Sequence, residues 1–314
     1  MCIRDRFQLG PGSVSTVSSL ERFVDLLVLG LKLGAIIAIS AIGLSLIYGV
    51  TGLVNFSHGE MVTLGAVIAF FFHTSVAGPE WPLLIAAIPA ILLGAGLGGG
   101  QELLLWRPLR RRGTGLIAMM VISIGLSFAL RNLILILFKG EPRSFVDYAV
   151  QREVEFLGVA TVPKNIVIVL TSVVILVLVG LFLERTKTGT AMRAVSDNKD
   201  LAESSGIDVN RVILTTWLVG GGLAAIGGIF LGVSEQLQFD MGFKLLLLIF
   251  AAVVLGGLGS AYGAMVGGFI VGVVVEVSTF WVATEFKTAV GLGVLILMLL
   301  LRPQGILGSR ERIG

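Results

Sequence analysis

The sequence predicts an all-α polytopic transmembrane helix bundle of about nine spans, with a range of eight to ten. Two features of its composition indicate a membrane protein. Of its 314 residues 55% are hydrophobic and only 14% are charged, and the mean hydropathy is +0.98. A soluble domain carries roughly 25% charged residues, so lipid is the expected solvent for this chain.

The third observation is the length of the apolar runs, since about 20 residues are needed to cross the hydrocarbon core. The runs fall at residues 26–48, 60–78, 82–106, 116–138, 165–183, 212–233, 244–259, 261–279 and 287–301. The stretch 244–279 is a single apolar block, which we divide at Gly259 and Ser260. No run alternates with a period of two, and helices satisfy their own backbone hydrogen bonds in lipid, so each span is predicted to be helical.

These runs delimit one membrane domain, residues 26–308. Residues 1–25 form an N-terminal extension without an assigned role, and residues 309–314 form a C-terminal tail. No cleavable signal peptide is evident, because the first apolar run is too long and lacks a small-residue cleavage site.

Lysine and arginine are unevenly divided between the two sets of loops. One set, with the C-terminal tail, holds twelve: Arg107, Arg110, Arg111, Arg112, Arg185, Lys187, Arg193, Lys199, Arg211, Arg302, Arg310 and Arg312. The opposite loops hold six, Lys139, Arg143, Arg152, Lys164, Lys244 and Lys287, and nine with the N-terminal segment included. Positive charge accumulates on the cytoplasmic side, so we expect the first set and the C-terminus to be cytoplasmic.

The motif search does not support an enzyme. Gly94, Gly96 and Gly99 satisfy a dinucleotide-binding pattern, but no strand precedes them. Residues 97–101 resemble the signature loop of ABC ATPases, yet Gly-Lys never occurs, so a P-loop is absent. The single cysteine, Cys2, excludes disulfides, and no metal site is expected. The net charge of +3 is too small and dispersed to suggest nucleic-acid binding.

Small residues recur four apart in several spans, which lets membrane helices approach closely. Three such ladders are Ala90, Gly94 and Gly98; Gly220, Ala224, Gly228 and Gly232; and Gly259, Gly263 and Gly267. Each one fits a static bundle, whereas several together favour a core whose helices can rock against one another, as transporters require. They do not separate a transporter from a channel.

The loop at about 184–211 is the most informative polar stretch. It carries five basic and five acidic residues. Asp197 or Asn198 is placed to cap a short helix through Glu203 that ends at Gly206. Such a helix under a membrane bundle suggests a docking surface, although a solvated connecting loop is the alternative.

Several segments, in order along nearly the whole chain, resemble the LivH-type permeases of branched-chain amino-acid ABC transporters. Residues 43–50 read Gly-Leu-Ser-Leu-Ile-Tyr-Gly-Val, and residues 55–60 read Asn-Phe-Ser-His-Gly-Glu, with Ser57 where that family often has alanine. Residues 193–207 resemble the family's ATPase-contacting loop, and residues 256–260 and 302–308 its C-terminal signature. The resemblance implies the ABC-importer permease type of fold.

It also implies a division of labour. Such a permease pairs with a second related permease, binds two cytoplasmic ABC ATPase subunits, and receives substrate from a periplasmic or lipid-anchored binding protein. ATP and Mg would then be bound by the ATPases, with no cofactor on this chain, which lies in membrane lipid of the bacterial cytoplasmic membrane. The expected coupling residues are Arg193, Asp197, Asn198, Ala202 and Gly206.

Charged and polar residues near the pathway are the remaining candidates. Asn55, His58, Gly59 and Glu60 follow the first span, where they are expected to fix a break between two helices or to contact the substrate directly. A pH-switch role for His58 is a weaker reading.

Lys32, Arg131 and Glu276 are ionisable residues inside spans, at a shared depth in the outer half. Lys32 and Arg131 could simply reach the interface, because their long side chains can snorkel. We expect Glu276 to face the interior and to pair with a cation, for which Arg131 is the candidate.

Other functions stay open at this stage. Urea or short amides are alternative substrates of the same architecture. A stand-alone channel or secondary transporter, or a structural membrane scaffold, is a rival from another class.

Overall fold

The computed structural model describes residues 19–74, 78–149, 151–152, 154–156, 159–302 and 304–307. Most of the N-terminal extension, the tail 309–314, and Arg310 and Arg312 lie outside these residues. The first helix begins at Ser19, ahead of the expected domain boundary at residue 26, so residues 19–25 continue that helix.

Among the described residues, seven helices are long and apolar enough to cross a membrane, two of them counted together with neighbouring helical turns. They are α1 (Ser19–Thr51), α3 (Leu83–Gln101), α5 (Leu116–Phe138), α7 (Pro163–Arg185), α10 (Val209–Ser234), α12 (Ala261–Ser278) and α13 (Lys287–Leu301). The all-α membrane prediction is therefore confirmed, and the boundaries of the expected runs agree with these helices within a few residues, except at the start of α1.

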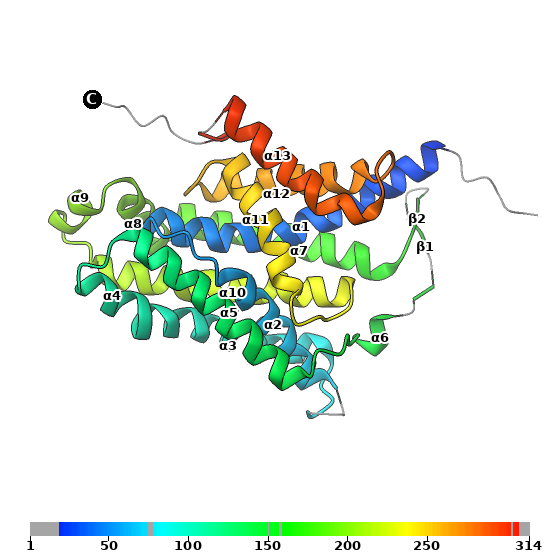
Figure 1. The fold of residues 1–314 in the computed structure, drawn as a ribbon, viewed down its shortest axis with the longest axis horizontal. Coiled ribbons are helices and arrows are strands. Elements are labelled where there is room, and N and C mark those ends of the chain that lie inside the picture. The colour runs from blue at the N-terminus through cyan, green and yellow to red at the C-terminus, as the bar shows by residue number, and fades with distance from the viewer. Residues whose placement is uncertain are drawn as a thin grey trace, which may run out of the picture.

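Two of the nine expected spans are shorter helices, α2 (His58–His73) and α11 (Met241–Gly256), of 16 residues each. At 1.5 Å per residue each measures about 24 Å, less than the roughly 30 Å of a hydrocarbon core. Both lie at a steep angle to α1, α10 and α12 (Figure 1). Short interrupted helices of this kind are typical of the substrate region in transporters.

The connecting elements are small. They are the π-helical turn η1 (Glu102–Trp106), α4 (Arg107–Arg111), α6 (Val146–Ala149), β1 (Val154–Phe156), β2 (Val159–Thr161), α8 (Lys187–Asp197), α9 (Lys199–Ser204) and the 3-10 turn η2 (Thr284–Phe286). The antiparallel hairpin β1–β2 is a local exception to the helical prediction. η1 and α4 continue α3, so the chain stays helical from Leu83 to Arg111.

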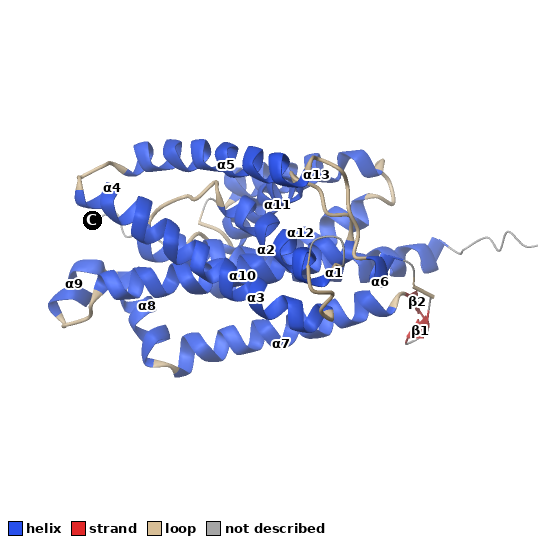
Figure 2. Cartoon of the chain, turned by 90° about the horizontal axis from the view of Figure 1, so that it is seen from below, coloured by secondary structure: helices blue, strands red, loops and turns tan. Residues whose placement is uncertain are grey.

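The two ends of the bundle differ in composition. α4, α8 and α9 lie together at one end, and α6 and the β1–β2 hairpin lie at the other (Figures 1 and 2). The first end carries the arginines of α4 and most of the basic residues counted above as one set. The fold thus gathers that set on one side, as the orientation argument assumed.

α1 and α10 form the centre of the bundle, and small residues let other helices pack closely on them. A Cβ added to Gly94 of α3 would lie 2.5 Å from the Cβ of Ala225 in α10, and one added to Gly228 would strike the carbonyl of Val62 in α2. On α12, Gly267 meets the carbonyl of Ala252 in α11 in the same way. The three ladders therefore lie in helix interfaces.

α5 and α7 are peripheral by comparison. α7 turns an apolar face outward that includes Leu170, Val174 and Leu178, each more than half exposed. α5 runs along one edge of the bundle (Figure 2) and packs on the described chain mainly through α2. The contact between α5 and α2 is also where the most deeply buried charges lie.

Candidate functional site

The break between α1 and α2 is built from a buried turn. Thr51 ends α1, Gly52 takes a left-handed φ of +69°, and Asn55, Ser57 and His58 that follow are fully buried. The backbone N–H and the hydroxyl of Ser57 donate to Asn55 Oδ1 at 3.1 and 2.7 Å. Non-helical backbone at membrane depth is tolerated where protein surrounds it, which is the case for this turn.

His58 anchors the first turn of α2 to the middle of α1. Its Nε2 lies 3.0 Å from the carbonyl oxygen of Ser40, an arrangement in which Nε2 carries the proton and donates it. Gly43 leaves room for the ring, because a Cβ there would lie 3.2 Å from His58 Cε1. His58 Nδ1 has no hydrogen-bond partner among the described residues. This contact gives His58 a structural role, because it joins α2 to α1.

Glu60 is fully buried and binds two residues of α5. Its Oε1 accepts hydrogen bonds from Arg131 Nε at 3.1 Å, from Arg131 Nη2 at 3.0 Å and from Ser127 Oγ at 3.1 Å. The Arg131 guanidinium also lies 3.7 Å from the centroid of the Phe243 ring on α11, a cation–π contact. Arg131 therefore joins α5, α2 and α11, and we call Glu60 and Arg131 the sealed pair.

The N-terminal turns of α2 and α11 meet beside this pair. A Cβ added to Gly59 would lie 2.6 Å from the carbonyl oxygen of Gly242, and Gly242 N donates to Thr63 Oγ1 at 3.0 Å. Only glycine at both positions allows this approach. The two shortened helices thus cross at the place where the buried charges are held.

The expected pairing of Glu276 with Arg131 is wrong. Glu276 Oε2 instead lies 2.7 Å from Lys287 Nζ at the start of α13, and Arg131 is taken by Glu60. Position along a helix determines depth, so the sequence places Arg131 and Glu276 at a similar level. Position along a helix does not determine which helices are neighbours, and the neighbouring helix determines the ion-pair partner. Glu276 and Lys287 are called the open pair below.

The open pair borders a cavity of about 380 Å³ between α1 and α10 to α13. The charged lining consists of Glu235, Lys244, Glu276 and Lys287. Lys32 lies within electrostatic range of Glu235 and Glu276 but belongs to no ion pair among the described residues. The three in-span charges are thus divided between two places.

The cytoplasmic-loop prediction agrees with the structure in its local details. Asn198 caps α9, with its Oδ1 accepting from Leu201 N at 2.9 Å, and Gly206 follows the helix with a φ of +84°. Arg193, Asp197, Asn198 and Gly206 are exposed. Ala202 is buried, at 4% exposure, so it supports the helix from beneath and presents no surface to a partner.

Leu201 is a surface residue that the sequence reasoning missed. It is 65% exposed at the tip of the α8–α9 end, beside acidic Asp200 and Glu203. A single exposed leucine is common on protein surfaces, so Leu201 is of interest here only because it lies on α9 among the expected coupling residues. The signal was present in the sequence, since Leu201 and Ala202 are adjacent and a short helix can bury only one of them.

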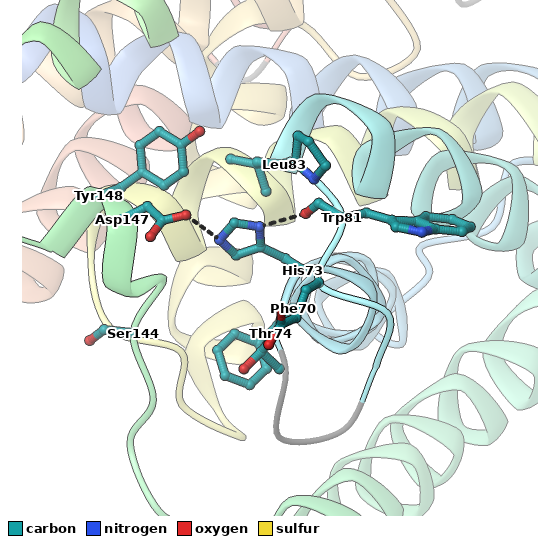
Figure 3. A pocket seen from close by; sticks show the side chains of 10 residues that line it. Phe70, His73, Thr74, Trp81, Leu83, Ser144, Asp147 and Tyr148 are labelled. Atoms are coloured by element: carbon teal, nitrogen blue, oxygen red, sulfur yellow. Dashed lines mark hydrogen bonds and ion pairs between the residues drawn. The ribbon is translucent and has the colours of Figure 1, made fainter.

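A further pocket of about 560 Å³ lies at the opposite end, around His73 (Figure 3). His73 Nδ1 lies 2.9 Å from the carbonyl of Trp81, and Nε2 lies 3.4 Å from Asp147 Oδ2. These contacts join the end of α2 to α6. Among the described residues no group of three His, Cys, Asp or Glu side chains is placed to hold a metal ion.

The comparisons with known proteins show the family of the chain. The family described as the permease component of branched-chain amino acid transport systems matches residues 26–299. The chain is 33% identical over 304 residues to the high-affinity branched-chain amino acid transport system permease protein LivH of Salmonella typhimurium, covering 90% of this chain and 94% of that protein.

Two further relatives are similarly close. The permease protein BraD of Pseudomonas aeruginosa is 32% identical over 92% of this chain and 97% of its own length. A probable LivH of Methanocaldococcus jannaschii is 30% identical over 87% of this chain and 89% of its own length. Among solved structures, PsaBC from Streptococcus pneumoniae in complex with Fab aligns with a TM-score of 0.48 at 14% identity, over 91% of this chain and 97% of that chain, and no argument rests on that likeness.

Proposed function

The chain belongs to the family of permease components of branched-chain amino acid transport systems, and on that premise we propose that it carries leucine, isoleucine and valine across the cytoplasmic membrane. The observation that carries the proposal is the match to LivH and BraD along almost the full length of both proteins. ATP hydrolysis belongs to partner subunits, because the family is the permease and this sequence has no P-loop.

The proposed complex contains this chain, a second related permease, two ABC ATPases that bind ATP and Mg, and a substrate-binding protein on the outer side. The α8–α9 end, with the C-terminus, faces the cytoplasm. Two features support this orientation: basic residues gather at that end, and its exposed helices carry the surface expected to meet an ATPase.

Arg193, Asp197, Asn198 and Gly206 remain the proposed coupling residues, with Leu201 added. In this proposal Leu201 inserts into an apolar depression of the ATPase, and the charges around it set the orientation. Closure of the ATPases then pushes α8 and α9, which pack on the inner ends of α1, α7 and α10.

Transport by the assembled complex tests the function. Proteoliposomes that contain all the subunits, with ATP on the ATPase side, are expected to accumulate radiolabelled leucine, isoleucine and valine, and not urea or acetamide. Uptake of urea or acetamide, without uptake of leucine, would show that the substrate is one of these solutes and not a branched-chain amino acid. Uptake by this chain alone, without ATPases, would show that it works as a channel or secondary transporter.

A variant at the proposed docking residue tests the coupling surface. Leu201→Asp is expected to reduce leucine uptake at least about tenfold, because a buried carboxylate at an interface costs more than 1.4 kcal/mol. The matched control is Asn210→Asp in the first turn of α10, which adds the same charge at an exposed position of the same end. Leucine uptake by Leu201→Asp at the rate of the parent transporter would show that Leu201 is not part of the coupling surface.

A further inference from the structure

We propose that the cavity at the open pair is a binding site for the zwitterionic amino acid within the permease itself. The inference rests on the proposed function, in that it assigns that function's substrate to named residues of this chain. Neither the family description nor the names of the relatives assign a substrate site to the membrane subunit.

The volume of the cavity and the distribution of its apolar and polar lining residues suit a branched-chain amino acid. Its volume of about 380 Å³ lies in the range of roughly 300–1,000 Å³ typical of small-molecule sites. Its inner wall is aliphatic and buried, formed by Leu33, Leu231, Leu245, Leu248 and Val275. Its rim is polar and charged. A solute with a charged head and a branched aliphatic tail fits this gradient with the tail inward.

The rim is bipolar and neutral overall. The cavity is lined by two carboxylates and two ammonium groups, Glu235 and Glu276 against Lys244 and Lys287. Asp240, which pairs with Lys244 at 2.9 Å, and Lys32 add one charge of each sign nearby. A site with both signs and no excess of either selects a zwitterion over a cation, an anion or an uncharged amide.

The salt bridge of the open pair fixes the position of the Lys287 ammonium, which is then available to the substrate. Glu276 has only 12% of its side chain exposed, and it accepts a single hydrogen bond from Lys287 Nζ at 2.7 Å. An ammonium has three donors, so two remain on Lys287, whose side chain is 30% exposed at the cavity. We assign the substrate carboxylate to Lys287, with Glu276 as its positioning residue.

The substrate ammonium is assigned to Glu235. This carboxylate is exposed at the cavity rim and belongs to no ion pair among the residues that the structure describes. It follows the end of α10, whereas Lys287 begins α13, and both line the cavity. The two ends of the amino acid are thus held by elements from different parts of the chain, and the aliphatic side chain covers Leu248 and Val275.

Direct binding to the assembled membrane complex tests the site without the binding protein. The complex of both permeases and both ATPases, in lipid nanodiscs and without ATP, is titrated with radiolabelled L-leucine. Saturable binding is expected. Neither 4-methylpentanoate, which lacks the ammonium, nor 3-methylbutylamine, which lacks the carboxylate, should compete at equal concentration.

Variants assign the two charges. Lys287→Met and Glu235→Gln are each expected to weaken leucine binding about tenfold or more, since each removes a charge-assisted hydrogen bond. The controls are Lys139→Met and Glu141→Gln, exposed residues of the same end that do not line the cavity, and they should bind as the parent complex does.

The positioning role of Glu276 has its own readout. Glu276→Gln should weaken leucine binding but leave discrimination against 3-methylbutylamine in place, because Lys287 is still present. Lys287→Met should lose that discrimination, since the carboxylate then has no partner.

Failure of the site can be told apart from failure of the function. No saturable leucine binding, or unchanged binding in both charge variants, would overturn the site while leucine uptake by the complete transporter left the proposed function intact. Displacement of a co-purified phospholipid from the cavity without any effect of leucine would also overturn it, as a lipid site. Absence of leucine uptake would instead overturn the proposed function.

Discussion

Two ion pairs inside the helix bundle have similar lengths and very different surroundings. Arg131 Nη2 and Glu60 Oε1 are 3.0 Å apart, and Lys287 Nζ and Glu276 Oε2 are 2.7 Å apart. In the sealed pair the glutamate side chain is 0% exposed and the arginine 15%, and Phe243 covers the guanidinium. In the open pair the glutamate is 12% exposed and the lysine 30%, and both line a cavity.

The difference in access decides what each pair can do. The sealed pair is buried at its glutamate and covered by Phe243 at its arginine, so its free energy goes into holding α5 against α2 and α11. Its loss leaves a charge stranded in a membrane interior. The open pair can exchange a partner with a solute at little cost, because water reaches it. Intramembrane charge alone therefore does not identify a substrate site, and we place the proposed site at the pair that borders a cavity.

The largest expected effect is on the sealed pair. Arg131→Met leaves Glu60 buried without a cation, and we expect the free energy of unfolding to fall by about 3–5 kcal/mol. Unfolding in mixed micelles titrated with SDS measures this, with the exposed Arg152→Met as the control.

The double variant Glu60→Gln with Arg131→Met removes both charges and should recover a large part of that loss. A single variant as stable as the parent would show that the pair does not fasten α5. A double variant no better than the single one would show that packing, not charge, accounts for the loss.

The helices of both regions could be predicted from the sequence, but their ion pairs could not. The apolar run 287–301 coincides with α13, and the division at Ser260 coincides with the cap of α12, where Ser260 Oγ accepts from Gly263 N. Hydrophobicity and capping are local properties, so one chain segment carries the signal. The shortening of α2 has a local signal that the expected run 60–78 passed over, since His73 and Thr74 are polar, whereas only Gly256 and Gly257 mark the end of α11.

Partner choice is a property of neighbouring helices, which explains the error at Arg131. One signal was available: Ser123, Ser127 and Arg131 are four residues apart and form a polar stripe on an otherwise apolar span. In the structure Ser127 and Arg131 meet Glu60, and Ser123 Oγ accepts from Phe56 N at 3.1 Å. A stripe of that kind predicts a buried polar face but not the helix that covers it.

An intermediate effect is expected from the glycine contact that closes the sealed region. Gly242→Ala places a methyl group against the carbonyl of Gly59 and 2.5 Å from Thr63 Oγ1, which should cost about 1–3 kcal/mol of unfolding free energy. Gly293→Ala in α13 is the matched control, since nothing lies within 4 Å of its Cβ. Equal stability of the two variants in the same SDS titration would mean that α2 and α11 separate freely.

The smallest effect on stability is expected at the open pair. Lys287→Met removes a salt bridge of comparable length to the sealed one, and the loss should be about 1 kcal/mol, because the adjoining cavity lets water reach Glu276, whose side chain is only 12% exposed. A loss as large as that of Arg131→Met would show that the open pair also fastens helices, and the contrast between the two regions would disappear.

The central claim is that substrate meets this chain at the open pair, and the Kd of leucine for the membrane complex without its binding protein tests it most directly. In nanodiscs that hold both permeases and both ATPases, Lys287→Met should raise this Kd about tenfold relative to Lys139→Met, in line with the loss of one charge-assisted hydrogen bond. The same Kd in both variants would contradict the account.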